Sequence, residues 1–273
     1  MAIKADYHMH THHSGDSSAR MEDMIGRAVS LGLTHICFTE HHDPDFVYDT
    51  PDKEGMFELD IPPYREECLR LSKENADRIS VGFGIELGVQ PDIPDTLAAV
   101  AGSEAFDFII ASSHLCHKKD PYYASFYEGR TIKEAMTEYF ESILENIRAF
   151  DDFDVYGHLD YAVRYAPVTD LSAYKYEDYA DITDEILRTL IERGKGIEIN
   201  TGGLRKALKR TNPGEEVLKR YRELGGEILT VASDAHEPAI IGDGFDMAEA
   251  ILTRCGFRYY TYFRERKPFF LPL

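Results

Sequence analysis

Short apolar runs alternate with longer amphipathic stretches along most of this chain. Runs rich in β-branched and apolar residues predict seven strands, at 3–8, 35–39, 81–87, 106–112, 154–158, 196–200 and 228–232. Helical patterns fall between them, at 20–31, 64–75, 131–150, 179–192, 215–224 and 243–255. The clearest is 131–150, where apolar residues recur at intervals of three and four and form one face. This alternation is typical of an α/β fold in which βα units build a parallel sheet.

The chain shows no internal boundary. No linker rich in Pro, Gly or Ser divides it, and α/β barrels of about this length form one unit with one core. We therefore predict a single domain over residues 1–273. Two long loops, 40–63 and 115–130, follow predicted strands, and long loops of this kind are usually functional.

Composition argues against two classes of partner. The 49 acidic and 30 basic residues give a net charge of −19, which opposes binding to a nucleic-acid backbone. A small phosphate ester stays possible, because bound cations can reverse the local potential in a site. The N-terminus lacks a secretory signal, no apolar run reaches the roughly 20 residues that span a bilayer, and the four cysteines form no Cys-x-x-Cys pair. We expect a cytoplasmic protein with reduced thiols.

Histidines and carboxylates gather where the predicted strands end, and in a parallel barrel those ends meet at one rim. In chain order these residues are His8, His10, His12, His13 and Asp16; Glu40, His41 and His42; Glu86; His114 and His117; His158 and Asp160; Glu198 and Asn200; and Asp234 and His236. Taken singly, His12, His117 and Glu198 are better explained as surface or hydrogen-bonded residues. The whole set is not explained in this way, because randomly placed histidines would also fall in the predicted helices, and none does.

The spacing of these residues predicts metal binding. His8 and His10 are two apart on an extended strand, so both side chains project from one face. Asp234 and His236 repeat that spacing on the last strand, which lies beside the first in a closed barrel. A buried Glu86 is costly unless it is paired or coordinates a metal, which favours a bridging carboxylate.

The donor types indicate two or three divalent ions. Imidazole and carboxylate without thiolate suit zinc, manganese or iron, and the candidate ligands outnumber those of a single ion. Paired ions can activate a water molecule and bind both oxygens of an in-line displacement at phosphorus. Phosphoester hydrolysis, with a small phosphate ester as the substrate, is therefore the chemistry that the residues favour.

Several short motifs resemble those of the polymerase and histidinol phosphatase family. They are Asp6-Tyr7-His8-Met9-His10, Thr39-Glu40-His41, Gly84-Ile85-Glu86, Ser112-Ser113-His114, Gly157-His158-Leu159-Asp160 and Ser233-Asp234-Ala235-His236. Each motif alone is weak, but their order across nearly the whole chain is specific. The resemblance implies a distorted (β/α)7 barrel, similar to a TIM barrel, with three metals at the carboxyl ends of its strands. It also implies hydrolysis of L-histidinol phosphate in histidine biosynthesis.

The resemblance further implies a ligand set. One ion would be held by His8, His10, Glu86 and Asp234; Glu86 would bridge to a second ion held also by His114 and His158; and a third would take Asp16, His41 and His236. His12 and His13 remain alternatives to Asp16, because the family uses either His or Asp there.

The phosphatase branch of the family is also similar in having arginines near the phosphate. Arg164 and Arg205 stand in comparable places, and a guanidinium binds phosphate oxygens in bidentate fashion. A solvated loop position is the alternative for both. His42 could contact phosphate or protonate the leaving alkoxide, or it could support its neighbour His41. Glu86 and Asp234 are expected to serve the reaction as well as metal binding.

Three other functions compete with this one. A phosphoesterase acting on another small ester or a nucleotide would use the same site. A non-catalytic, metal-binding regulatory module would often have lost ligands, and none is missing here. Amidohydrolases also begin with His-x-His, but their barrels have eight strands and commonly a bridging carboxylated lysine, and no lysine ends a predicted strand. The sequence leaves the oligomeric state open.

Overall fold

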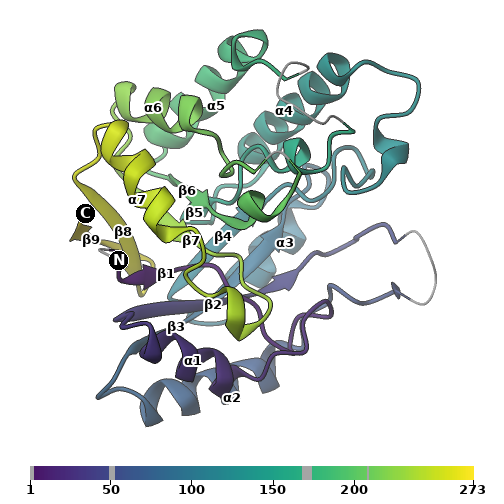
Figure 1. The fold of residues 1–273 in the computed structure, drawn as a ribbon. Coiled ribbons are helices and arrows are strands. Elements are labelled where there is room, and N and C mark those ends of the chain that lie inside the picture. The colour runs from purple at the N-terminus through teal and green to yellow at the C-terminus, as the bar shows by residue number, and fades with distance from the viewer. Residues whose placement is uncertain (1–2, 49–52, 168–173, 208) are drawn as a thin grey trace.

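The barrel is closed by its first and last strands (Figure 1). The computed structural model describes residues 3–48, 53–167, 174–207 and 209–273. Its parallel sheet runs in chain order through β1 (Ala5–Asp6), β2 (His35–His42), β3 (Ser80–Gly88), β4 (Phe108–Ser112), β5 (Val155–Tyr156), β6 (Gly196–Asn200) and β7 (Leu229–Ala232). Closure comes from backbone bonds: Tyr7 N donates to Val231 O at 3.0 Å, and Asp234 N donates to His8 O at 2.9 Å. The predicted seven-stranded barrel is confirmed.

Helices surround this sheet and bury their apolar faces on it (Figure 1). They are α1 (Met21–Ser30), α2 (Ile61–Glu74), α3 (Pro94–Ala101), α4 (Ile132–Ala149), α5 (Ala180–Glu192), α6 (Glu215–Glu223) and α7 (Phe245–Arg254). Helix α4 begins with a capping box, in which the Thr131 side chain accepts from Glu134 N and the Glu134 side chain accepts from Thr131 N. None of the helices in the described ranges is both long and apolar enough to cross a membrane.

An antiparallel hairpin that the sequence pattern did not predict follows the barrel. It consists of β8 (Tyr259–Arg264) and β9 (Lys267–Pro272). Its turn residues, Glu265 and Arg266, have φ angles of 48° and 62°, a conformation for which Asn and Gly are the usual signals. The hairpin contacts the amino ends of the barrel strands, where Leu229 N donates to Thr261 Oγ1 at 3.1 Å and Glu265 N donates to Asp107 Oδ1 at 3.0 Å.

Candidate metal centre

Glu86 lies at the centre of a buried histidine cluster at the carboxyl ends of the strands. Its Oε2 is 3.1 Å from His8 Nε2 and 2.9 Å from His41 Nδ1. Its Oε1 is 3.3 Å from His114 Nε2 and 3.0 Å from His158 Nε2. The two oxygens of one carboxylate therefore face two different pairs of imidazoles, which is the arrangement that a bridging ligand requires.

Close packing of β2 against β3 sets this position. The register pairs His41 with Glu86, so their side chains emerge side by side. Gly84 permits the approach, because a Cβ there would lie 2.7 Å from Cys37 Sγ and 2.9 Å from Phe38 O. A larger residue at this point would push the two strands apart and move Glu86 away from the imidazoles.

Asp234 joins the cluster from the strand that closes the barrel. Its Oδ1 lies 3.8 Å from His8 Nε2 and 3.6 Å from His10 Nε2. Its backbone is left-handed, with a φ of 54°, a strained conformation for a residue other than Gly. The predicted pairing of the first and last strands thus brings His8, His10 and Asp234 together.

Asp16 lies on the solvent side of the same cluster. Its Oδ2 is 3.6 Å from His41 Nε2 and 3.2 Å from His236 Nε2. His12 and His13 instead direct their Nε2 atoms toward Glu67 Oε2, at 3.4 and 2.7 Å. Of the alternatives near the end of the first strand, the geometry brings Asp16 to the predicted ligands.

Several atoms of the cluster are buried without a hydrogen-bond partner. They are His8 Nε2, His10 Nε2, His41 Nδ1 and Glu86 Oε2. Buried polar atoms are rarely left unpaired, because each costs the free energy of its lost hydration. These atoms converge on one another, and a divalent cation would satisfy them together. The residues present therefore fit metal ions.

The pKa shifts of three residues in the cluster are consistent with metal binding. Burial alone would raise the pKa of Glu86, but the imidazoles of His8 and His114 hold it well below its usual range, so the carboxylate is ionised. Burial, with the positive potential of His41, lowers the pKa of His10 and keeps that ring neutral, as a ligand must be. At His41 burial acts in the same direction, yet the nearby carboxylates raise its pKa to about 9, so metal binding there would displace a proton.

Carboxylates behind the cluster orient the imidazoles. His8 Nδ1 donates to Glu198 Oε2 at 2.8 Å, and His158 N donates to Glu198 Oε1 at 2.8 Å. His114 Nδ1 donates to Asp43 Oδ1 at 2.7 Å. Metal-ligating histidines commonly donate their second nitrogen in this way. The hydrogen-bonded role expected for Glu198 fits this geometry, whereas sequence reasoning did not single out Asp43, whose one signal is its place directly after His42.

Ser14 connects the turn after β1 to the cluster. Its Oγ lies 3.2 Å from His10 Nδ1, accepts from His41 N at 3.0 Å and donates to Glu40 Oε2 at 2.5 Å. Glu40 also accepts from Thr11 N and Thr11 Oγ1, at 2.9 and 2.6 Å. The buried Glu40 therefore fixes the turn that positions His10 and Asp16, a role that its place at the end of a strand did not reveal.

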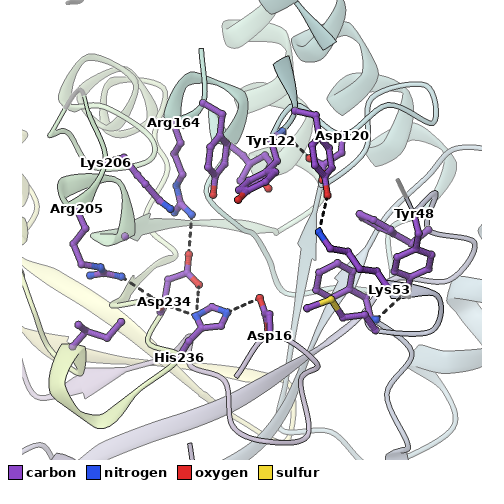
Figure 2. Close-up of a pocket in the computed structure, with 18 residues that line it drawn as sticks. Asp16, Tyr48, Lys53, Asp120, Tyr122, Arg164, Arg205, Lys206, Asp234 and His236 are labelled. Carbon is purple, nitrogen blue, oxygen red and sulfur yellow. Dashed lines mark hydrogen bonds and ion pairs between the residues drawn. The ribbon is translucent and has the colours of Figure 1, made fainter. Parts of the chain in front are cut away.

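A cavity of about 460 Å³ opens above the cluster (Figure 2). Asp16, Asp234 and His236 line its floor, and Arg164 and Arg205 line one side. Arg164 donates to Asp234 Oδ2 at 2.9 Å, to Asn200 Oδ1 at 2.6 Å and to Asn212 Oδ1 at 2.7 Å. Aromatic side chains make up much of the remaining wall: Phe46, Tyr48, Phe57, Tyr122, Tyr123, Tyr161 and Tyr165.

Arg205 and His42 differ in how far they reach this cavity. Arg205 donates to Ser233 O at 2.8 Å and lines the cavity beside Arg164. His42 does not line it, because successive residues of β2 point to opposite faces and His41 takes the inner one. His42 Nδ1 instead accepts from Leu59 N at 3.0 Å. The structure thus brings both arginines to the predicted ligands. His42 lies outside the cavity and contacts the backbone of Leu59 instead.

A parallel barrel whose strand ends carry converging imidazoles and carboxylates beneath an open cavity defines the class of metal-dependent hydrolases. Comparison with known proteins narrows the class. The PHP domain matches residues 6–202, and the chain belongs to that family. The matched residues include Glu86 and all of strands β2 to β6, whereas β7 lies beyond the match.

Two relatives extend the similarity over nearly the full length. The histidinol-phosphatase of Lactococcus lactis is 33% identical over 97% of this chain and 96% of its own. A probable histidinol-phosphatase of Clostridium acetobutylicum is 33% identical over 93% and 94%. The crystal structure of histidinol phosphate phosphatase from Lactococcus lactis, complexed with zinc, L-histidinol and phosphate, superposes with a TM-score of 0.89 at 32% identity and covers 97% of this chain and 98% of that one.

Proposed function

We propose that this protein is a metal-dependent phosphomonoesterase that hydrolyses L-histidinol phosphate to L-histidinol and phosphate. The observation that carries the proposal is the set of buried, unpartnered imidazole nitrogens around Glu86, which opens onto a cavity lined by Arg164 and Arg205. Similarity to the Lactococcus lactis enzyme over nearly the full length supports the choice of substrate.

Two or three divalent ions, of zinc, manganese or iron, would occupy the cluster. His8, His10, Glu86 and Asp234 would hold one; Glu86, His114 and His158 a second; and Asp16, His41 and His236 a third. Such ions supply an activated water molecule and positive charge that stabilises the phosphoryl transition state. His41 lies between two of these groups, since its Nδ1 faces Glu86 and its Nε2 faces Asp16.

Arg164 and Arg205 bind the phosphate in this proposal. Arg164 has five N–H groups and uses three of them on Asp234, Asn200 and Asn212. Within the described residues the remaining N–H groups are available to a bidentate anion, and the three acceptors hold the guanidinium in place before the substrate arrives. Burial would lower the pKa of Arg164, but Asp234 raises it, so the side chain stays a cation.

The aromatic wall binds the rest of the substrate. Histidinol carries an ammonium group and an imidazole, and both suit tyrosine faces and a nearby carboxylate. Asp120, Tyr122 and Tyr123 line the same cavity as Arg164 and come from the long loop 115–130, which was expected to be functional. Figure 2 shows Asp120 and Tyr122 on its wall. Phosphate and ammonium would thus be held by different residues of one cavity.

A phosphate-release screen tests this proposal. Metal-loaded protein is offered L-histidinol phosphate and a panel of other small monoesters, including nucleotides, and kcat/KM is compared. We expect histidinol phosphate to exceed the other substrates roughly tenfold or more, because its side-chain contacts are specific. Faster hydrolysis of another ester would show that histidinol phosphate is not the preferred substrate. No phosphate release from any ester would exclude the phosphatase function.

A further inference from the structure

His12, His13 and Glu67 form a second group of metal-ligating side chains. The two histidines lie in the turn after β1, and Glu67 lies on α2. Their three ligand atoms are within 4.8 Å of one another, and the imidazole centroids are 4.3 Å apart. The group shares no residue with the proposed ligands of the strand-end cluster, and none of its members lines the cavity.

The geometry of His12 directs its Nε2 atom toward Glu67. Its Nδ1 lies 3.4 Å from Ala19 O, to which it can only donate. In the neutral ring the lone pair is then on Nε2, the atom that faces Glu67 at 3.4 Å. A backbone carbonyl that accepts from the second ring nitrogen is a common feature of histidines that bind metals.

The spacing of the group is close to that of a coordinated ion. Metal–nitrogen and metal–oxygen distances near 2.0 to 2.2 Å place neighbouring ligand atoms of a tetrahedral site about 3.4 Å apart. His12 already has this spacing from Glu67 Oε2, and His13, at 2.7 Å, would need to withdraw by less than about 1 Å. The His12 side chain is 44% exposed, so an ion and a water ligand can reach the site from solvent.

We propose that His12, His13 and Glu67 bind one divalent transition-metal ion that is separate from the ions of the strand-end cluster. Two imidazoles and one carboxylate suit Zn²⁺, Co²⁺, Ni²⁺ or Cu²⁺ better than Mg²⁺ or Ca²⁺. The alternative is that both histidines contact Glu67 directly with no ion between them, at 3.4 Å from His12 and 2.7 Å from His13.

Such an ion would link the turn after β1 to helix α2. The turn that carries His12 and His13 also carries Ser14, which contacts His10, and Asp16, which faces His236. Coordination by Glu67 would tie this turn to α2. The accessory ion would therefore stabilise the position of Asp16 without contacting substrate.

Metal counting in matched variants tests the proposal. Wild-type holoenzyme, Glu67→Gln, His13→Asn and the control Glu66→Gln, an exposed neighbour on α2, are dialysed to equilibrium against Zn²⁺ and analysed for bound metal. We expect Glu67→Gln and His13→Asn each to hold one equivalent less than wild type and Glu66→Gln. Equal metal content in all four proteins would leave only the direct contacts with Glu67 and overturn the proposal.

Two further readouts locate the missing ion. Cu²⁺ bound to wild type but not to Glu67→Gln should give an electron paramagnetic resonance signal with nitrogen hyperfine structure, as two imidazole ligands require. Phosphate release by Glu67→Gln, at the same Zn²⁺ concentration, should stay within about tenfold of wild type. Loss of one equivalent together with nearly all phosphate release would place that ion in the strand-end cluster and refute the accessory site.

Discussion

Asp107 and Asp154, at the amino end of the barrel, differ from Glu86, at the carboxyl end, in the partners of their carboxylates. At the amino end, Asp107 accepts from Phe83 N at 3.0 Å and from Glu265 N at 3.0 Å, and Asp154 Oδ2 accepts from Ile109 N at 2.8 Å and from Arg266 Nε at 2.6 Å. At the carboxyl end, Glu86 Oε2 lies among imidazoles without a hydrogen bond.

This difference indicates that the carboxylates at the amino end contribute to stability, whereas Glu86 serves the function of the site. Backbone amides and the Arg266 guanidinium satisfy the amino-end carboxylates, so these residues hold the hairpin against the barrel. Glu86 and the imidazoles around it are arranged for a ligand, and their unpaired atoms cost free energy until a cation binds. Substitutions at the two ends should therefore have different consequences.

Replacement of Glu86 should have the largest effect. Glu86→Gln keeps the shape but removes the charge that faces His8, His41, His114 and His158. We expect kcat/KM for histidinol phosphate to fall on the order of 10³-fold or more, with a loss of bound metal. The amino-end control, Asp107→Asn, should keep kcat and metal content while the free energy of unfolding falls by about 1 to 3 kcal/mol. Similar losses of kcat/KM in both variants would contradict the proposed difference between the two ends of the barrel.

Arg164→Lys should have the next largest effect. Lysine keeps the positive charge but cannot donate in bidentate fashion, so we expect kcat/KM to fall about 10²-fold with the metal content unchanged. Arg266→Lys is the matched change at the amino end, where the arginine pairs with Asp154, and steady-state kinetics should show little loss there. If Arg164→Lys retained the wild-type kcat/KM, the phosphate-binding role would be lost.

Glu198→Gln should act on the metal and leave the substrate contacts intact. Its carboxylate accepts from His8 Nδ1 and His158 N, and removing such an acceptor typically costs 10- to 100-fold in metal affinity. A competition titration with a chelating dye measures this loss, and excess metal should restore most of the activity. Unchanged metal affinity would show that Glu198 only supports packing.

The smallest expected effect is on the pH dependence of stability, and it comes from Asp154 at the amino end of the barrel. Burial, partly opposed by Arg266, raises the pKa of Asp154 above 3.8. The protonated form is then favoured by folding, so this contribution to stability is complete below pH 3.8 and is lost as pH rises through the folded-state pKa.

Asp154→Asn cannot titrate, so the stability that it loses relative to wild type should shrink as pH rises above 3.8. Denaturant unfolding of both proteins, in chelator, measures that difference, and titration of the histidine cluster cancels between them. A deficit that grows with pH would contradict the sign of the shift.

The strand-end pattern made much of the site predictable. The spacing of two between His8 and His10, and between Asp234 and His236, depends only on strand geometry and barrel closure, and both pairs converge as expected. His42 was harder to place, because the second strand was expected to end at Thr39. It continues to His42, and alternation along it turns that side chain outward.

Other features lacked a local signal. Helix α3 has only eight residues, and only Leu97 and Ala101 are buried on it, too few to show a helical period. The hairpin turn uses Glu265 and Arg266 where Asn or Gly would have marked it. The pairing of Asp43 with His114 joins residues 71 positions apart, a contact that depends on the folded barrel.

Stepwise metal reconstitution tests the central claim most directly. Protein stripped by a chelator is given increasing equivalents of Zn²⁺, and bound metal and phosphate release from L-histidinol phosphate are measured in the same samples. We predict no release without metal, a rise in rate as the strand-end cluster fills, and no comparable rise in Glu86→Gln. Full activity in the stripped protein, or a fully loaded protein that releases no phosphate, would contradict the account.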